Sequence, residues 1–186
     1  MTTRQELRRA RLEAFGVDRF YYFCRLQNVT QILNHGLLPK DEVEKRGLPS
    51  QSFAEETVQT RRHRRHVTLS NGKKTTIHGL VPVYLTPRTP TLYSRRKIKW
   101  DICFLDIGLE AVCDAGTEFA FSDGNCASQD TYIYNSLDDL KQIPWEVLRT
   151  EFWNEHEDGV RQRNAEFLIY PYVKPACIRR LVVMDV

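Results

Sequence analysis

The sequence lacks the features that place a protein in a membrane or direct it out of the cell. No apolar run approaches the roughly 20 residues that a membrane-spanning helix needs. The first fifteen residues, MTTRQELRRARLEAF, have no apolar core of the kind found in a signal peptide. We therefore expect a cytoplasmic protein without a membrane partner.

Cysteine is scattered, and no CxxC pair occurs among the five residues of this type. An odd number without paired spacing does not match a disulfide framework or a zinc site. His63 and His66 have a spacing that a metal ion could bridge, but the arginines around them repel a cation and no acid is close in the sequence. We expect reduced thiols that pack as small apolar side chains, and no metal.

The two commonest phosphate-binding loops are also missing. No GxGxxG motif follows a predicted strand, and GxxxxGK[ST] does not occur. Strands and helices do not alternate regularly, so a doubly wound nucleotide-binding fold is disfavoured. Any nucleotide must therefore be held in another way.

The chain does have the composition of one compact domain. Its 186 residues are 41% hydrophobic and 27% charged, close to globular averages. The net charge of +3 is uneven, because RRHRRH at 61–66 is densely basic and EHEDG at 155–159 is acidic. Local patches must therefore carry any anion binding. We expect residues 1–186 to form a single domain that acts as a monomer.

Periodicity predicts an α+β domain built on an antiparallel or mixed sheet. Residues 4–15 form a predicted helix ended by Gly16, within an N-terminal helical extension of residues 1–19. A strand at 20–26 precedes a helix ended by Gly36. Further strands are expected in GLVPVYLTP, DICFLDIGLEAV, EFAFSD, EFLIY and RRLVVMDV, and two short helices in SLDDLKQIPWEVLRTEFW. Side chains expected to face inward from the first two helices are Leu7, Ala10, Leu12, Phe15, Val29, Ile32 and Leu33.

Residues 38–78 are polar, basic and without a period. So long an irregular stretch inside a domain is typical of a functional loop, and we expect a basic loop that binds substrate or cofactor. The run RRHRRH within it has an ordinary interpretation as a solvated loop. Basic residues combined with aromatic ones are also what single-stranded nucleic acid requires. The aromatic residues available as stacking surfaces are Tyr21, Tyr22, Tyr84, Tyr93, Tyr132 and Tyr134.

One residue breaks the pattern of its strand. In NAEFLIY, residues 164–170, Glu166 lies between Ala165 and Phe167 on a segment that is otherwise largely apolar. A carboxylate there loses hydration unless a cation or a hydrogen-bond donor meets it. The ordinary interpretation is a charge at the strand end that turns into water, and the alternative is a role in chemistry.

Six motifs follow one another from about residue 20 to the end of the chain. They are FYYFCRLQNVTQILNHGLL, VQTRRHRR, IHGLVPVYLTPRTPTLY, FSDGNCAS, IPWEVLRTEFW and RQRNAEFLIY. Their order resembles the DarT family of DNA ADP-ribosyltransferase toxins. The resemblance implies a split antiparallel or mixed sheet with flanking helices and an NAD cleft. It implies transfer of ADP-ribose from the co-substrate NAD to a nucleobase in single-stranded DNA, by a toxin or anti-phage effector with an antitoxin that binds it or reverses the modification.

The resemblance also assigns residues to roles. Glu166 becomes the catalytic glutamate, and Arg62, the second arginine of VQTRR, lies beside the NAD and the reacting base. A carboxylate near the ribose would stabilise the positive charge that grows as nicotinamide leaves. Residues expected at the NAD cleft are Tyr22, Phe23, Cys24, Asn28, Arg62 and Tyr84. Residues expected at nucleic acid are Arg61, Arg64, Arg65, Thr91, Arg161 and Arg163, with residues 154–164 as the loop that recognises the acceptor.

Three positions depart from the family pattern and leave the choice of base open. Tyr22 and Cys24 stand where the family usually has His and Thr, and Thr91 replaces a common Met. Unpaired DNA is the expected substrate, because extruding a base from a duplex costs a few kcal/mol. RNA is an alternative, since a stacking groove lined with arginine reads either polymer unless it contacts the 2′-hydroxyl. The rival hypothesis is an inactive nucleic-acid-binding module that keeps the fold without catalysis.

Overall fold

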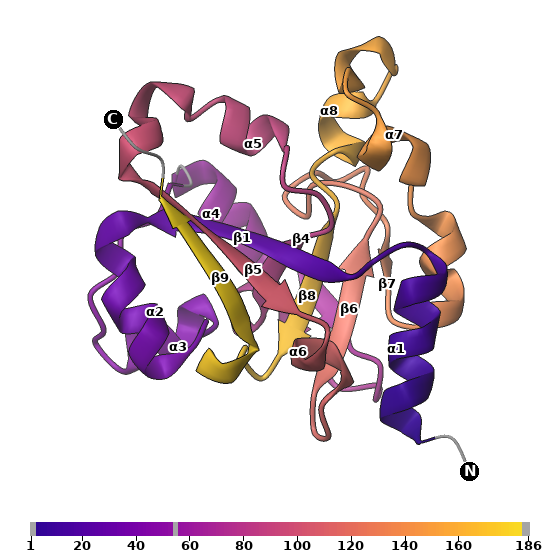
Figure 1. Ribbon diagram of the computed structural model, residues 1–186, viewed down its shortest axis with the longest axis horizontal. Helices are drawn as coiled ribbons and strands as arrows, with labels where there is room; N and C mark the ends of the chain where they lie inside the picture. Colours follow the sequence, from indigo (N-terminus) through magenta and orange to yellow (C-terminus); the bar gives the residue numbers. More distant parts are fainter. Residues whose placement is uncertain (1–2, 54–55, 184–186) are drawn as a thin grey trace.

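The computed structural model describes residues 3–53 and 56–183 (Figure 1). Its framework is a seven-stranded sheet in the order β7-β6-β8-β4-β1-β5-β9, and all of its pairings are antiparallel. These strands are β1 (Arg19–Arg25), β4 (Val81–Tyr84), β5 (Ile102–Gly108), β6 (Glu118–Ser122), β7 (Ile133–Tyr134), β8 (Glu166–Tyr170) and β9 (Ile178–Val183). A separate hairpin joins β2 (His66–Thr68) to β3 (Lys74–Thr76). The predicted α+β class is confirmed.

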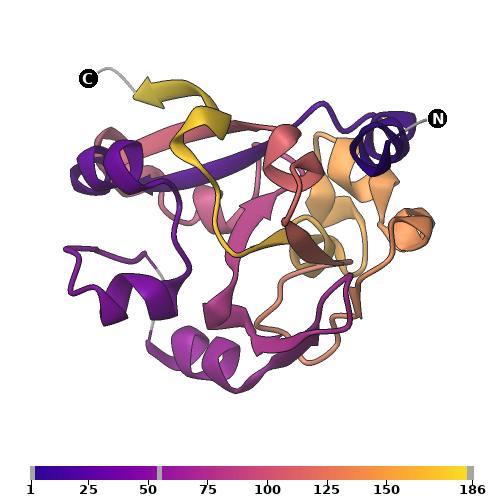
Figure 2. The same cartoon turned by 90° about the horizontal axis from the view of Figure 1, so that it is seen from below.

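Short helices surround the sheet. They are α1 (Arg4–Ala14), α2 (Val29–His35), α3 (Lys40–Lys45), α4 (Glu56–Arg64), α5 (Pro90–Tyr93), α6 (Glu110–Cys113), α7 (Trp145–Arg149) and α8 (Gly159–Gln162). Single 3-10 turns are η1 (Leu26–Asn28), η2 (Ile77–Gly79), η3 (Arg96–Asp101), η4 (Leu137–Gln142), η5 (Trp153–Glu155) and η6 (Pro175–Cys177). Figure 2 shows α3 and α4 on one side of the molecule, with α1 and β9 toward the other. Among the described residues, no helix is long and apolar enough to cross a membrane.

Strand β8 is buried on both of its faces, which explains how an acid can be hidden in it. Phe167 is fully buried on one face, and the rings of Phe20 and Phe119 lie 4.9 and 5.3 Å from its ring. Leu168 points the opposite way, into a second apolar cluster under the β2–β3 hairpin. Alternation along the strand puts Glu166 on the same face as Leu168, so the hairpin side of the molecule covers both.

Two glycines end helices where the sequence predicts it. Gly16 follows α1 with φ +75°, and Gly36 follows α2 with φ +81°. At Gly36 a Cβ atom would lie 2.1 Å from the carbonyl oxygen of Val173, so a side chain fits neither the backbone conformation nor the space. This close approach joins α2 to the segment that leads into β9.

Some predictions about these helices are wrong. Leu7 and Leu33 are 54% and 48% exposed, Ala10 is also exposed, and none of the three faces the core. In α1 the buried polar residue is Arg8, whose guanidinium donates to the carbonyl oxygens of Val112 and Thr117 at 2.9 and 2.7 Å. A sequence pattern treats an arginine as exposed, whereas here the carbonyls of a distant turn satisfy its donors.

The segment 38–78 is not the irregular loop that its composition suggests. Among the described residues, it contains α3, α4, β2, β3 and the start of η2. The sequence of α4, ETVQTRRHR, has Val58 as its single aliphatic residue of any size, so it has no apolar stripe from which a helix could be recognised. Packing of its last turn against the sheet, described below, supplies the order that periodicity does not reveal.

Candidate active site

Glu166 lies near the middle of the sheet, where strands flank it on both sides. It opens β8 between β6 and β4, directly opposite Tyr84 in the antiparallel register. Only 2% of its surface is exposed. The ordinary interpretation of this residue, a strand-end charge that turns into water, is therefore excluded.

Three donors hold the Glu166 carboxylate. Arg62 donates from Nη1 to Oε1 at 3.1 Å and from Nη2 to Oε2 at 2.6 Å, a bidentate pair. The backbone N–H of Cys126 donates to Oε1 at 3.0 Å. Since the pair is almost fully enclosed, each of the two charges depends on the other for the solvation it has lost.

Arg62 reaches Glu166 from the last turn of α4, 104 residues earlier in the chain. Burial alone would lower the pKa of Arg62. The opposing charge and hydrogen bonds of Glu166 outweigh that effect and raise the pKa above its usual value. The arginine is thus a fixed cation. Its guanidinium has five N–H donors, and two of them serve Glu166, which leaves others for a bound anion.

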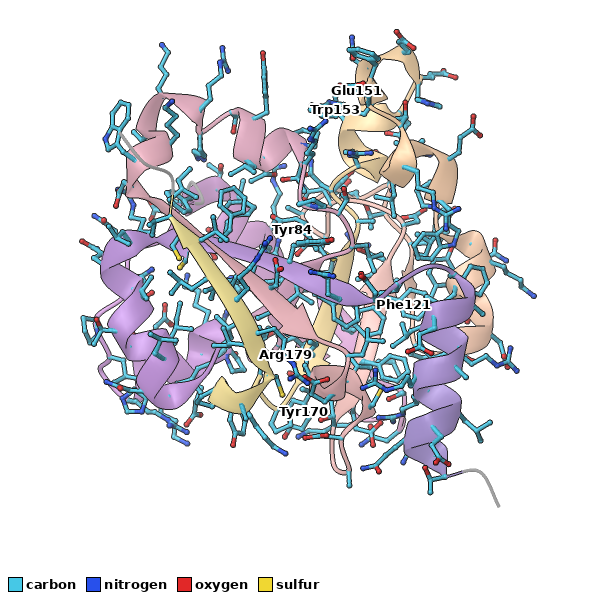
Figure 3. The ribbon with its side chains drawn as sticks, in the orientation of Figure 1. Tyr84, Phe121, Glu151, Trp153, Tyr170 and Arg179 are labelled. Carbon is cyan, nitrogen blue, oxygen red and sulfur yellow. The ribbon has the colours of Figure 1, made fainter. Side chains whose placement is uncertain are left out.

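A cleft of about 620 Å³ opens beside this ion pair, within the range of small-molecule sites. All six residues predicted at the NAD cleft line it, together with Glu166 and Thr91. One wall is aromatic, with the rings of Phe23 and Tyr84 stacked at 5.3 Å. Figure 3 shows Tyr84 at the centre of the molecule, over the sheet. The fold thus brings the six residues predicted at the NAD cleft together around one cavity.

Burial affects the titration of the groups around the carboxylate. It raises the pKa of the Tyr22 and Tyr84 hydroxyls, and it raises the pKa of the Cys126 thiol to about 12. All three stay neutral at physiological pH. The tyrosines can therefore donate hydrogen bonds into the cleft, while Cys126 is not a thiolate nucleophile.

Asn28 has a role that its sequence position does not reveal. Its side-chain nitrogen donates to the Gln51 carbonyl oxygen at 2.9 Å, and its Oδ1 accepts from the Gln51 N–H at 3.1 Å. Gln51 is thereby fastened to the turn after β1, and Leu48 and residues 50–53 line the cleft. The ring centroids of Phe53 and Phe23 lie 6.0 Å apart, and Arg95 donates to the Phe53 carbonyl at 2.7 Å. Sequence reasoning misses this wall of the cleft, because no repeat or motif marks it.

A second hollow, of about 880 Å³, lies on the other side of α5. Helix α5 and the residues that follow it form a shared wall: Thr91 and Arg95 face the cleft, and Leu92 and Tyr93 face the groove. In Figure 3 Glu151 and Trp153, on the opposite wall, lie at the upper edge of the molecule. The groove is lined by Arg88, Thr89, Pro90, Tyr93, Arg96, Lys99, Phe152, Trp153 and Val160, among others.

Thr91 lies at the boundary between cleft and groove. Its hydroxyl donates to Oδ1 of Asn164 at 2.8 Å, and the side-chain nitrogen of Asn164 donates to the Val160 carbonyl at 2.8 Å. The predicted acceptor loop, 154–164, is therefore connected to α5 through this asparagine. Residue Thr91 faces the cleft, as predicted for a position near the acceptor base.

Of the predicted nucleic-acid contacts, Arg61 and Arg64 are exposed on α4. The structure corrects the other three arginines. Arg163 is 3% exposed and donates to the carbonyls of Arg88, Val147 and Thr150. Arg161 is paired with Asp123 and Asp158, and Arg65 donates to the carbonyls of Cys126, Ser128 and Thr131. These three guanidiniums hold the protein's own loops. Arg65 and Arg163 satisfy backbone carbonyls, and Arg161 pairs with carboxylates.

The fold also brings an acid to the histidines of the basic run. Ligand atoms of Asp41, His63 and His78 lie within 4.8 Å of one another, on α3, α4 and η2. Burial, with help from Lys40 and Arg62, lowers the pKa of His78. The positive charges of Lys40 and Arg62 would also repel a metal ion at this position. His78 Nε2 already lies 2.9 Å from Gln59 Oε1. His66, the partner that the sequence suggests for His63, is not in the group.

Comparison with known proteins identifies the family. The family model for DarT, ssDNA thymidine ADP-ribosyltransferase, matches residues 21–186. A DNA ADP-ribosyl transferase of Thermus aquaticus is 27% identical over 173 residues, which is 89% of this chain and 74% of that protein. Another from Thermus sp. is 28% identical, over 88% of this chain and 79% of that protein.

Solved structures share the fold. DarT of Thermus sp. 2.9 in complex with ADP-ribosylated ssDNA superposes with a TM-score of 0.77 at 24% identity, over 91% of this chain and 82% of that one. The same protein in complex with NAD+ gives a TM-score of 0.73 at 23% identity, over 91% and 83%. The expected ADP-ribosyltransferase-like sheet is thus confirmed. The chain belongs to the DarT family of single-stranded DNA thymidine ADP-ribosyltransferases.

Proposed function

We propose that this chain transfers ADP-ribose from NAD to a thymidine base in single-stranded DNA, with Glu166 and Arg62 at the reacting centre. The observation that carries this proposal is the bidentate Arg62–Glu166 pair at the side of a cleft that also contains every predicted NAD residue. The family name supplies the acceptor, and the relatives solved with NAD+ and with modified ssDNA support the two substrates.

Glu166 supplies fixed negative charge to the centre where positive charge develops. Cleavage of the bond between nicotinamide and ribose makes the ribose electron-poor, and a carboxylate already in place stabilises it without reorganisation. Arg62 and the Cys126 N–H keep the carboxylate in that place. Arg62 also lines the cleft, so its remaining donors are available to NAD phosphates or to the acceptor base there.

The groove beyond α5 has side chains suited to binding single-stranded nucleic acid. Tyr93 and Phe152 are 59% and 57% exposed. The rings of Tyr93 and Trp153 form a T-shaped pair with their centroids 6.2 Å apart. Such exposed rings are stacking surfaces for unpaired bases. Cations that line the same groove or adjoin it are Arg88, Arg96 and Lys99. Helix α5 separates the groove from the cleft, so a nucleic-acid strand bound in the groove could extend one base past α5 into the cleft.

Two alternatives remain distinct from this proposal. RNA could occupy the same groove, since stacking and cations do not distinguish it from DNA. An inactive binding module would need no enclosed carboxylate, so the Arg62–Glu166 pair argues against it: such a pair costs desolvation and contributes little net stability.

The function is tested by incubating the protein with NAD and a panel of oligonucleotides. The panel holds single-stranded DNA, duplex DNA and RNA, with and without thymidine or uridine. We expect one ADP-ribose adduct by mass spectrometry, on thymidine-containing single-stranded DNA. Adducts on RNA alone would select the first alternative, and binding without any adduct would select the second.

Replacing Lys99 by Ala tests the groove. If Lys99 neutralises one phosphate, its removal flattens the log–log salt dependence of single-strand affinity by about 0.7 unit. Sequence preference should hardly change, because phosphate contacts position a strand and base contacts select it. The measurement is oligonucleotide binding at several salt concentrations. Lys141→Ala, an exposed cation on η4 away from the groove, is the matched control, and equal slopes for both variants would contradict the assignment.

One relative suggests a partner protein that removes the ADP-ribose. A Thermosipho africanus protein, 27% identical over 170 residues, is a fusion of a DNA ADP-ribosyl transferase with a DNA ADP-ribosyl glycohydrolase. We propose that the present chain acts as a toxin and that an antitoxin with glycohydrolase activity opposes it. Phage defence would be the setting in which such a pair is useful to the host.

A further inference from the structure

The loop between β6 and β7, residues 123–132, contacts the catalytic carboxylate directly. Its residue Asn125 lines the cleft, and Cys126 donates its N–H to Glu166 Oε1 at 3.0 Å. The loop contains only turns and bends. Hydrogen bonds within the loop fix part of its shape: the Asn125 carbonyl accepts from the Ser128 N–H at 2.9 Å and from the Thr131 hydroxyl at 2.8 Å. Contacts with other parts of the chain add to this order and help to keep the Cys126 N–H aimed at Glu166.

Arg65 makes three hydrogen bonds to the loop from outside it. Its Nη1 donates to the Cys126 carbonyl at 3.0 Å and also to the Ser128 carbonyl, and its Nη2 donates to the Thr131 carbonyl. One planar guanidinium thus gathers three carbonyls from across the loop. Arg65 is only partly buried, so burial in the core does not by itself force its guanidinium to bond to these carbonyls.

Arg62 and Arg65 approach Glu166 from neighbouring positions in the chain. Arg62 lies in the last turn of α4, and Arg65 directly follows the helix, three positions after Arg62. Arg62 contacts the carboxylate itself, whereas Arg65 contacts the loop whose Cys126 N–H contacts the carboxylate. Arg62 therefore supplies two of the three hydrogen bonds to Glu166, and Arg65 contacts the residue that supplies the third.

A second arginine borders the loop but does not replace this contact. Arg161 donates from Nη1 to Asp123 Oδ1 at 2.8 Å and to Thr131 Oγ1 at 3.1 Å. It thus holds the two ends of the loop, while Arg65 bonds to the carbonyl of Cys126. Loss of Arg65 would leave the ends in place and remove the donor from the Cys126 carbonyl, so that, among the described residues, Cys126 would keep hydrogen bonds only with Glu166 and Ser122.

We propose that Arg65 is a positioning residue for Glu166, which acts through the β6–β7 loop and not by contact with DNA. The proposal rests on the proposed function for its catalytic consequence. It changes the meaning of the basic run: Arg62 and Arg65 organise the carboxylate, and only Arg61 and Arg64 are directed to solvent. A displacement of about 1 Å at a reacting group is enough to cost roughly 100-fold in rate.

The first test measures the loop itself and needs no activity. Amide hydrogen exchange is compared for the unaltered chain, Arg65→Ala and Lys74→Ala, an exposed cation on the neighbouring hairpin strand. We expect faster exchange at residues 123–132 in Arg65→Ala alone, with β8 and α4 still protected. Unchanged protection of this loop would overturn the proposal. If β8 also lost protection, Arg65 would support the whole fold and the proposal would equally fail.

The second test measures turnover. Arg65→Ala is expected to lower kcat for transfer by about 10- to 100-fold, with KM for NAD and the salt dependence of DNA affinity within twofold of their original values. Arg65→Lys, which can satisfy some of the carbonyls, should recover part of kcat. A flatter salt dependence with unchanged kcat would return Arg65 to phosphate binding. If the unaltered chain transfers nothing, the proposed function fails, while the exchange result still decides the loop contact.

Discussion

Glu166→Gln is expected to reduce transfer by roughly 1,000-fold or more, with only a small change in KM for NAD. Glutamine has nearly the same shape and keeps an oxygen for Arg62 or for the Cys126 N–H, but it has no charge to offer a positive ribose. The interaction that is lost is made chiefly in the transition state, so the loss should fall on kcat. The measurement is the yield of adduct on thymidine-containing single-stranded DNA.

Two controls belong to this substitution. Circular dichroism should show an unaltered fold, and expression of the unaltered chain should be toxic to cells while expression of Glu166→Gln is tolerated. Near-normal turnover would remove Glu166 from the reacting centre. Equal toxicity of the two chains would favour the inactive binding module, because a module of that kind does not depend on the carboxylate.

Arg62→Ala is expected to damage stability as well as activity. It leaves an enclosed carboxylate without its cation, and breaking a buried ion pair from one side typically costs about 3–5 kcal/mol. Activity should fall further than in Arg61→Ala or Arg64→Ala, whose side chains are exposed. Thermal unfolding and adduct yield are the two measurements.

A double variant separates the two effects of Arg62. In Arg62→Ala with Glu166→Ala neither charge of this pair remains, so the protein should be more stable than Arg62→Ala alone although it is inactive. If the double variant were the less stable of the two, the residues would contribute independently, and the pair would not be the unit that the geometry indicates.

Residues in strongly patterned segments were predictable. Strand β1, helix α2 and its end at Gly36 follow from an aromatic run, a helical period and a glycine, because each of these features acts locally. Glu166 could be recognised as unusual since an acid on an apolar strand breaks the alternation of its neighbours. Its role still required the resemblance to a family, because the pattern alone left a solvent-exposed charge as the ordinary explanation.

Residues that act through distant contacts were not predictable. In the sequence, Arg65, Arg161 and Arg163 resemble surface charges. Only the folded chain shows that backbone carbonyls accept hydrogen bonds from Arg65 and Arg163, and that the carboxylate of Asp123 accepts one from Arg161. Helix α4 was missed for a related reason: it has no apolar face, and its last turn is held by Arg62. Charge density predicted where the cations are, but not which of them face inward.

The order of the sheet has a consequence for the synthesis of this protein. Arg62 lies early in the chain, the Cys126 N–H comes later, and the carboxylate that both of them meet follows on β8. Domains form as units while a chain emerges from the ribosome, N-terminal parts first. A nascent chain that has not yet released β8 has the cations of the site and much of the cleft but lacks the acid. If Glu166 has the proposed catalytic role, the activity arises only after β8 has been made and inserted between β6 and β4, and we expect prematurely terminated chains that end before Glu166 to be inactive.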